Sequence, residues 1–234
     1  MRKALFNKII SEKSADVIVA ITLKPDDDII EEAYKLNIPL ILIENDHKLA
    51  HSILVDNYLG VNLALEHLKS IGKKNIVVIG GALVPLKGEE INPTAKERYE
   101  ASLEWFKKNY FDYYNKFYFV YGYLYEEGYQ LADKILKDHP KVDAIFSAAG
   151  DGVASGVLSR LKEKGVDVPQ DIAIVGYDNY KLICENTQPK LTSVSQKLED
   201  VGQYVLEIIK SLHKDKFKIK KFKIKPELVI RSSS

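Results

Sequence analysis

The chain of 234 residues has a single cysteine, almost no net charge and no long apolar run. Cys184 cannot form a disulfide within the chain, and the N-terminus lacks the charged-then-apolar pattern of a secretion signal, so a reducing cytoplasm is the expected location. Lys and Arg total 34 against 33 Asp and Glu, which leaves no global field to attract DNA or an anionic membrane. No segment approaches the roughly 20 apolar residues of a membrane-spanning helix. These absences favour a cytoplasmic globular protein without membrane contact.

Short apolar runs alternate with amphipathic stretches along most of the chain. The apolar runs predict buried strands, which cover residues 15–21, 38–44, 52–56, 75–81, 116–122, 142–149 and 171–178. Apolar residues at three- and four-residue spacing predict helices, which cover residues 28–36, 57–71, 94–109, 125–138 and 151–164. Alternation of strand and helix is typical of α/β proteins with parallel sheets.

Two of the predicted strands end in the same dipeptide. The run "HSILV" leads to Asp56-Asn57, and "IAIVGY" leads to Asp178-Asn179. In open parallel sheets, ligands bind outside the carboxyl ends of the strands. Both Asp-Asn pairs are therefore candidates for a ligand site.

The C-terminal part of the chain has a different pattern. After residues 191–196, a helix is predicted at 201–212, and residues 217–231 read as extended. The lysine-rich stretch 214–225 alternates Lys with Phe and Ile. This pattern fits a basic strip for nucleic acid, but it fits better a strand with one buried face and one solvated face.

An enzymatic alternative rests on Gly150–Gly156, which follows a predicted strand and opens a predicted helix. A glycine-rich loop in that position can cradle a pyrophosphate, as in a nucleotide-dependent enzyme. The glycine spacing is loose, however, and the first strand-helix junctions carry no such loop. Neither a metal-like histidine cluster nor a nucleophile arrangement stands out, and no cofactor is implied.

Several segments together resemble the lactose/galactose-repressor (LacI/GalR) family of transcriptional regulators. The resemblance rests on "VDNYLGVNLALEHLKSIGKKNIVVIGG", on "DAIFSAAGDGVASGVLSRLKEKGVDVPQDIAIVGYDN", and on "LTSVSQ" and "PELVIRSS" in the same order, and it spans roughly residues 15–233. It implies an α/β, two-lobed, periplasmic-binding-protein-like fold with parallel sheets flanked by helices. It also implies a sensor without enzymatic activity that binds a small effector, a carbohydrate or related metabolite, in a cleft between the lobes.

Seven residues occupy positions that the family uses for its effector or that lie beside such positions. They are Asp56, Asn57, Arg98, Tyr123, Asp151, Asp178 and Gln196. The resemblance implies that Asp178 accepts hydrogen bonds from the effector and that Arg98 donates them, while Tyr123 stacks on it. Simpler roles remain open at this point, because Asp56 or Asn57 could cap a helix, Arg98 could be a solvated charge and Tyr123 could belong to the core.

The chain also departs from the family pattern. Gly150-Asp151 stands where Asn-Asp is usual, which removes an amide often used on the ligand. The family's DNA-binding domain and the first strand-helix-strand unit of the sensor have no counterpart, so the N-terminal lobe is expected to be truncated.

The lobes are expected to comprise residues 1–74 with 197–213, and residues 75–196 with 214–234. The expected assembly is a homodimer that reaches operator DNA only through a domain absent from this chain. A solute-binding protein for uptake is a further alternative.

Overall fold

The computed structural model describes residues 2–84, 92–109, 111–113, 116–212 and 218–234. The chain divides into two compact units, one of Met1–Asp56 with Lys197–Ile224 and one of Asn57–Gln196 with Lys225–Ser234. We call them unit 1 and unit 2. Among the described residues, no helix is both long and apolar enough to cross a bilayer.

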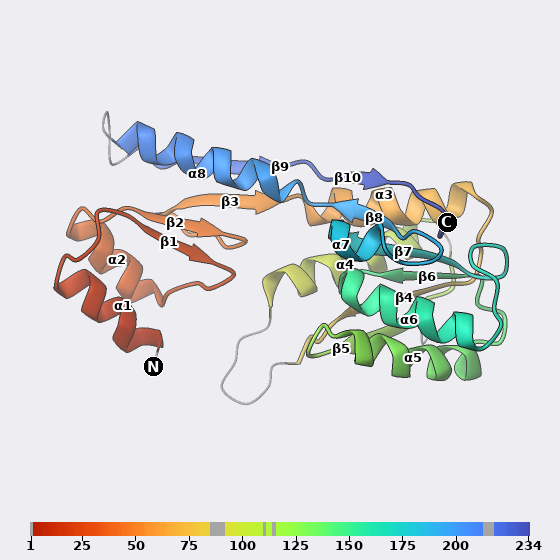
Figure 1. Cartoon of the computed structure of the whole chain (residues 1–234). Coiled ribbons are helices and arrows are strands. Elements are labelled where there is room, and N and C mark those ends of the chain that lie inside the picture. The colour runs from red at the N-terminus through yellow and green to blue at the C-terminus, as the bar shows by residue number, and fades with distance from the viewer. Residues whose placement is uncertain (1, 85–91, 110, 114–115, 213–217) are drawn as a thin grey trace. The chain divides into compact units, whose positions relative to one another are not determined.

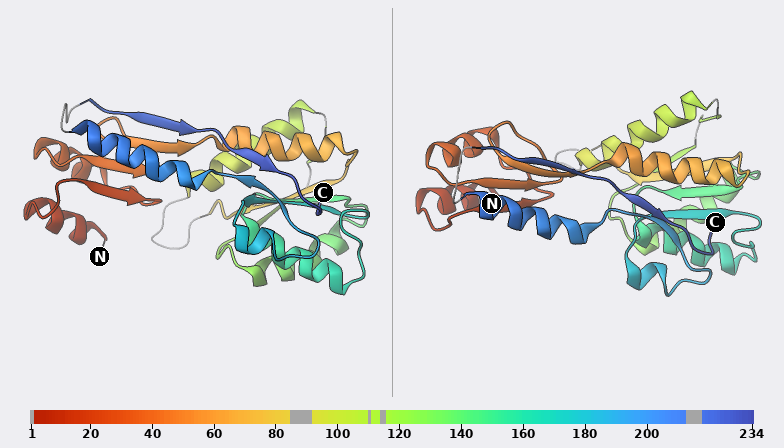
Figure 2. Two further views of the ribbon diagram at one scale, coloured as in Figure 1. Left: turned by 45° about the horizontal axis from the view of Figure 1, so that its top comes forward. Right: turned by 90° about the horizontal axis from the view of Figure 1, so that it is seen from above.

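Unit 1 is built on a parallel sheet in the order β1-β2-β3-β9 (Figure 1). Its strands are β1 (Ile18–Ile21), β2 (Leu40–Ile43), β3 (His51–Val55) and β9 (Lys221–Ile224). Side chains alternate between the faces of a strand. Leu40 and Leu42 therefore pack with the core beneath α1 (Arg2–Ser11) and α2 (Asp27–Lys35), whereas Ile41 and Ile43 pack beneath α8 (Leu198–Leu212). The two views in Figure 2 show these helices on opposite faces of the sheet.

Unit 2 contains a sheet in the order β10-β8-β7-β6-β4-β5, parallel except for β10. The strands are β4 (Ile76–Gly81), β5 (Phe117–Val120), β6 (Ala144–Ser147), β7 (Ala173–Asp178), β8 (Thr192–Ser195) and β10 (Glu227–Val229). The helices are α3 (Asn57–Ser70), α4 (Pro93–Lys108), α5 (Tyr125–Asp138), α6 (Asp151–Glu163) and the short α7 (Lys181–Cys184).

Each face of the unit 2 sheet is covered by a pair of long helices (Figure 1). Ile76 and Val78 lie in the core that includes α3 and Trp105 of α4, while Val77 and Ile79 lie in the core under α5 and α6. The central strands β4, β6 and β7 are buried on both faces, which explains why they read as continuous apolar runs in the sequence. The α/β architecture expected from that pattern is confirmed.

The unit boundaries differ from those expected from the sequence. Residues 57–74 are expected in the first lobe, but α3 buries Val61, Leu65 and Leu68 in the core of unit 2. Residues 214–234 are expected in the second lobe, and 225–234 do lie in unit 2, but β9 pairs with β3, and Phe222 of β9 stacks on Tyr204 of α8 in unit 1. Core contacts decide these assignments, and the linear pattern does not show them.

The described part of the lysine-rich stretch contains strand β9, as the favoured interpretation predicted. Lys220, Lys221 and Lys223 form ion pairs with Glu207, Asp46 and Asp56, respectively. Residues 214–217 of that stretch lie outside the described residues. Lys220, Lys221 and Lys223 thus belong to the ion-paired surface of unit 1.

Candidate functional site

Most of the candidate residues lie at the carboxyl ends of the parallel strands of unit 2. Asp178 is the last residue of β7, Gln196 follows β8, Tyr123 lies in the loop after β5, and Asp151 opens α6 after β6. Arg98 reaches the same edge from α4, and Asn57 begins α3. The sheet order places β6, β7 and β8 side by side, so residues far apart in the sequence come together here.

Arg98 is the centre of this group and is only 8% exposed. Its Nε donates to Asn57 Oδ1 over 3.0 Å, and its Nη1 donates to the carbonyl oxygen of Ala148 over 2.9 Å. The guanidinium lies against the ring of Tyr177, with its central carbon 3.7 Å from the ring centroid. Bonds at the edge and an aromatic ring against the face hold the guanidinium in one orientation.

Asn57 and Tyr177 both contact Arg98 and are bonded to each other. The Tyr177 hydroxyl donates to the same Asn57 Oδ1 over 3.3 Å, and Asn57 Nδ2 donates to Glu97 Oε2 over 2.8 Å. Gly60, one turn into α3, leaves room for the tyrosine, because a Cβ there would lie 2.2 Å from the Tyr177 hydroxyl oxygen. The sequence pointed to Asn57 but gave Tyr177 and Glu97 no role. The one local feature of the sequence that relates to Tyr177 is the glycine at position 60, which leaves space for the tyrosine side chain.

Asp178 presents a carboxylate beside this arginine. Its Oδ1 lies 3.8 Å from Arg98 Nη1 and accepts a hydrogen bond from Gln196 Nε2. Although 38% of the side chain is exposed, burial raises the pKa of Asp178, and the Arg98 charge and the Gln196 bond only partly oppose that shift. A positive charge and a carboxylate thus lie side by side at the end of β7.

The backbone at this point is left-handed, with φ of 103° at Asp178 and 55° at Asn179. Such angles are uncommon outside glycine, and Asn and Asp tolerate them best. Asn179 faces away from Arg98, since its N–H donates to Ser193 Oγ and its Oδ1 accepts from Arg231 Nη2 over 2.7 Å. The turn therefore directs the aspartate into the candidate site and uses the asparagine as a structural tie.

Tyr123 is 39% exposed and also has a left-handed backbone, with φ of 57°. Its ring lies close to the end of β4, where a Cβ on Gly81 would be 2.1 Å from the tyrosine hydroxyl oxygen. Burial raises the pKa of Tyr123, against the opposing effects of the Arg98 charge and a hydrogen bond from the Asn92 side chain. Tyr123 thus adds a partly exposed aromatic ring near Arg98.

Asp151 has a different environment from the other candidates, because it is 1% exposed. Its Oδ1 accepts from Ser193 Oγ over 2.6 Å, and its Oδ2 accepts from the Tyr180 N–H over 2.7 Å and from Cys184 Sγ over 3.3 Å. Burial raises the pKa of Asp151 to about 6. With both oxygens bonded inside the fold, this carboxylate has the contacts of a structural residue.

Asp56 belongs to unit 1, where its backbone N–H donates to the Ile224 carbonyl oxygen over 2.9 Å. Its carboxylate forms an ion pair with Lys223 over 3.0 Å. These contacts join the end of β3 to the end of β9. The first Asp-Asn pair is thus divided, with its aspartate in unit 1 and its asparagine in the Arg98 cluster of unit 2.

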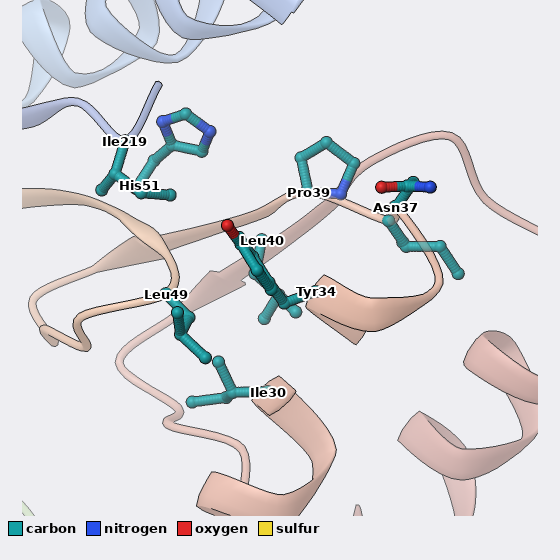
Figure 3. Close-up of a pocket in the computed structure, with 9 residues that line it drawn as sticks. Ile30, Tyr34, Asn37, Pro39, Leu40, Leu49, His51 and Ile219 are labelled. Carbon is teal, nitrogen blue, oxygen red and sulfur yellow. The ribbon is translucent and has the colours of Figure 1, made fainter. Parts of the chain in front are cut away.

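Unit 1 contains a small cavity of its own. Figure 3 shows His51 and Ile219 on one side of it and Pro39 and Asn37 on the other, with apolar side chains below. His51 Nδ1 accepts from the Lys220 N–H, while its buried Nε2 has no hydrogen-bond partner in the part of the chain that the structure describes. The cavity lies at the starts of β2 and β3, and none of the candidate effector residues lines it.

The glycines of Gly150–Gly156 are explained largely by packing. A Cβ on Gly156 would lie 2.0 Å from the carbonyl oxygen of Tyr125, and one on Gly150 would lie 2.7 Å from Asp178 Oδ2. Gly156 thus allows α6 to approach α5 closely, and Gly150 adopts φ of 110° next to a carboxylate. An acidic neighbour is a poor environment for a pyrophosphate, so this loop does not have the character of a nucleotide cradle.

The sequence and the fold were compared with known proteins. The family model described as "Periplasmic binding protein-like domain" matches residues 65–234. The chain belongs to this family. The resemblance to the effector-binding domains of LacI/GalR-type regulators is confirmed by the relatives and structures that match.

The HTH-type transcriptional repressor PurR of Actinobacillus pleuropneumoniae serotype 3 (strain JL03) is 28% identical over 229 residues, which cover 95% of this chain and 65% of the repressor. The transcriptional regulator CelR in complex with cellobiose matches with a TM-score of 0.82, at 22% identity, over 99% of this chain and 69% of that chain. The lac repressor dimer bound to operator and the anti-inducer ONPF matches with a TM-score of 0.83, at 20% identity, over 99% of this chain and 78% of that chain. The two structural matches show the fold, and this LacI/GalR-type domain spans less than two thirds of PurR.

Proposed function

We propose that this LacI/GalR-type domain senses a small polyhydroxylated effector, a carbohydrate or related metabolite, at the strand ends of unit 2. The residues that would contact it are Asn57, Arg98, Tyr123, Asp178 and Gln196. The observation that carries the proposal is the fixed Arg98 guanidinium with the Asp178 carboxylate 3.8 Å away. Both are held by protein contacts, so the pair is preorganised for a ligand.

The chemistry of the pair selects the ligand class. A hydroxyl group both donates and accepts hydrogen bonds, so neighbouring hydroxyls can accept from Arg98 and donate to Asp178 at once. A simple anion would be repelled by Asp178, and a simple cation by Arg98. Tyr123, 39% exposed, offers an aromatic face to the apolar side of a sugar ring.

The regulatory role of the complete protein is a further part of the proposal. PurR is a transcriptional repressor, and the solved neighbours include a cellobiose complex and an operator-bound dimer. By analogy, effector binding to this domain would change operator occupancy of a homodimeric regulator through a DNA-binding domain outside this chain. A dimer with two-fold symmetry is the commonest arrangement among soluble homo-oligomers.

A thermal-shift screen tests the effector class. Cellobiose, D-ribose, lactose, hypoxanthine and NAD are added singly to the parent and to Asp178→Asn. A compound at 100 times its dissociation constant stabilises the native state by about 2.7 kcal/mol, which for a protein of this size shifts Tm by roughly 5 to 10 °C. We expect a sugar or nucleobase to shift the parent clearly more than the variant. A shift by NAD alone, equal in both proteins, would favour the nucleotide-dependent enzyme instead.

A further inference from the structure

The loop that presents Tyr123 is organised by one carboxylate. Glu127 Oε1 accepts from the backbone N–H groups of Tyr121 and Gly122 over 2.8 and 3.1 Å, and its Oε2 accepts from those of Gly122 and Leu124 over 3.0 and 3.0 Å. The Tyr123 N–H is also directed at it, so four consecutive backbone donors converge on one side chain. Burial opposes ionisation of Glu127, but these four donors outweigh it and lower its pKa.

This convergence determines where the Tyr123 ring lies. Four consecutive N–H groups can point at one anion only if the backbone turns through an unusual conformation, and Tyr123 supplies it with φ of 57°. Left-handed φ is unfavourable for a residue with a bulky side chain, so contacts from another residue are needed to stabilise this loop conformation. Glu127 provides these contacts, and the ring then lies over Gly81, with its hydroxyl bonded by Asn92 and within the field of Arg98.

We propose that Glu127 is a positioning residue for effector recognition, which acts by holding the Tyr121–Leu124 loop so that Tyr123 is placed beside Arg98 before any effector binds. The proposal rests on the proposed function for its consequence in binding, but its structural part can be tested without an effector. Glu127 itself need not touch the effector.

Two substitutions isolate this role. Glu127→Gln keeps the size of the side chain but offers one acceptor oxygen in place of two, and its NH₂ group would face backbone N–H donors. Glu126→Gln is the matched control, because Glu126 is the preceding residue, lies exposed in the same first turn of α5 and loses the same charge. Any effect of net charge or of the helix dipole is shared by both variants.

The first experiment places 3-fluorotyrosine at position 123 alone and records ¹⁹F NMR spectra without ligand. In the parent, we expect a resonance distinct from that in urea, and we expect Arg98→Lys to move it. In Glu127→Gln, the resonance should move most of the way to the urea value and lose its response to Arg98→Lys, while Glu126→Gln should match the parent. An unchanged spectrum in Glu127→Gln would overturn the proposal.

The second experiment measures affinity by calorimetry for cellobiose, D-ribose, lactose and hypoxanthine. For each compound that the parent binds, we expect Glu127→Gln to weaken binding by 3- to 10-fold and to add less than 2-fold once Tyr123 is already alanine. Full additivity of the two substitutions would show that Glu127 does not act through Tyr123. If no compound binds the parent, the proposed function fails for this panel, and the fluorine spectra still decide the role of Glu127.

Discussion

The two Asp-Asn pairs look equivalent in the sequence, yet the structure uses opposite members of each. In Asp56-Asn57, the asparagine bonds Arg98 and the aspartate forms an ion pair with Lys223. In Asp178-Asn179, the aspartate lies beside Arg98, and the asparagine is tied to Arg231 and Ser193. The same dipeptide at the same place in a strand therefore does not predict which side chain faces the ligand.

Backbone conformation accounts for the difference. Asn57 is the first residue of α3, so the chain enters a right-handed helix directly after the strand. Asp178 and Asn179 both have positive φ, which turns the chain before α7 begins. The left-handed turn costs on the order of 1 to 3 kcal/mol per residue. We infer that the cost is offset by the Arg231 and Ser193 contacts of Asn179, which leave Asp178 available for recognition.

Removing the cation that both pairs share should have the largest effect. Arg98→Met removes the donors that Arg98 supplies to Asn57 Oδ1 and to the Ala148 carbonyl in a buried setting, and we expect it to destabilise unit 2 by about 3 kcal/mol and to abolish effector binding. The single tryptophan, Trp105, lies in the core of unit 2, so its fluorescence in urea reports on this unit. Arg160→Met, which removes a more exposed arginine that forms ion pairs with Asp133 and Glu163, should destabilise the unit much less. Equal losses in the two variants would contradict the central role of Arg98.

The second pair can be dissected by changing its members one at a time. Asp178→Asn keeps a residue that tolerates left-handed φ but removes the charged acceptor, so we expect affinity for the effector found in the screen to fall by about 10- to 100-fold. Asn179→Asp should change affinity by less than about 3-fold, because that side chain faces Arg231. Calorimetry on both variants tests the assignment. Similar losses in both would mean that the two side chains share the ligand.

The fold was predictable because its signals are local and repeated. Strands β1, β2 and β4 to β7 fall within predicted runs, and β3 is shifted by one residue from its run, since buried strands are largely apolar. Individual side-chain roles in the candidate site were less accessible, because direction depends on φ at Asp178 and Asn179 and on partners such as Tyr177, which lies 120 residues from Asn57. The sequence did not point to Glu127, because its carboxylate accepts hydrogen bonds from backbone N–H groups, and such bonds leave no pattern of residue types.

Asp151 allows a carboxylate that is bonded inside the fold to be distinguished from one that binds the effector. Its pKa is about 6 in the fold against an ordinary 3.8, so the native state holds a proton more tightly than the unfolded state. Stability should therefore fall as pH rises from about 4 to 6, by roughly 2 to 3 kcal/mol. Asp151→Asn should remove this slope in urea titrations followed at Trp105, and it should leave effector affinity nearly unchanged once folding is complete. A slope equal to that of the parent would show that another group is responsible.

A substitution at Tyr177 tests how much its hydroxyl bond to Asn57 contributes to stability and to effector affinity. Tyr177→Phe keeps the ring under the guanidinium and removes only the hydroxyl that donates to Asn57, so Asn57 Oδ1 keeps its bond from Arg98. We expect a loss of stability of about 1 kcal/mol and a loss of affinity of about 2- to 5-fold. Tyr118→Phe, which removes a hydroxyl bonded to Asp138 away from the site, is the control and should leave affinity unaltered. A loss of affinity in the control as large as that in Tyr177→Phe would indicate a general effect of stability.

The smallest effect is expected at Asp56, the aspartate of the first pair. Asp56→Asn weakens an ion pair with Lys223, whose side chain is 60% exposed, and exposed pairs contribute about 0 to 1 kcal/mol. The backbone bond from the Asp56 N–H to Ile224 remains, so the end of β3 stays joined to β9. We therefore expect less than a 3-fold change in effector affinity, compared with 10-fold or more for Asn57→Ala, which withdraws an acceptor from Arg98. Calorimetry on the two single variants measures this contrast directly. A loss of affinity in Asp56→Asn as large as that in Asn57→Ala would restore Asp56 to the effector site and would make the two Asp-Asn pairs equivalent in function as well as in sequence.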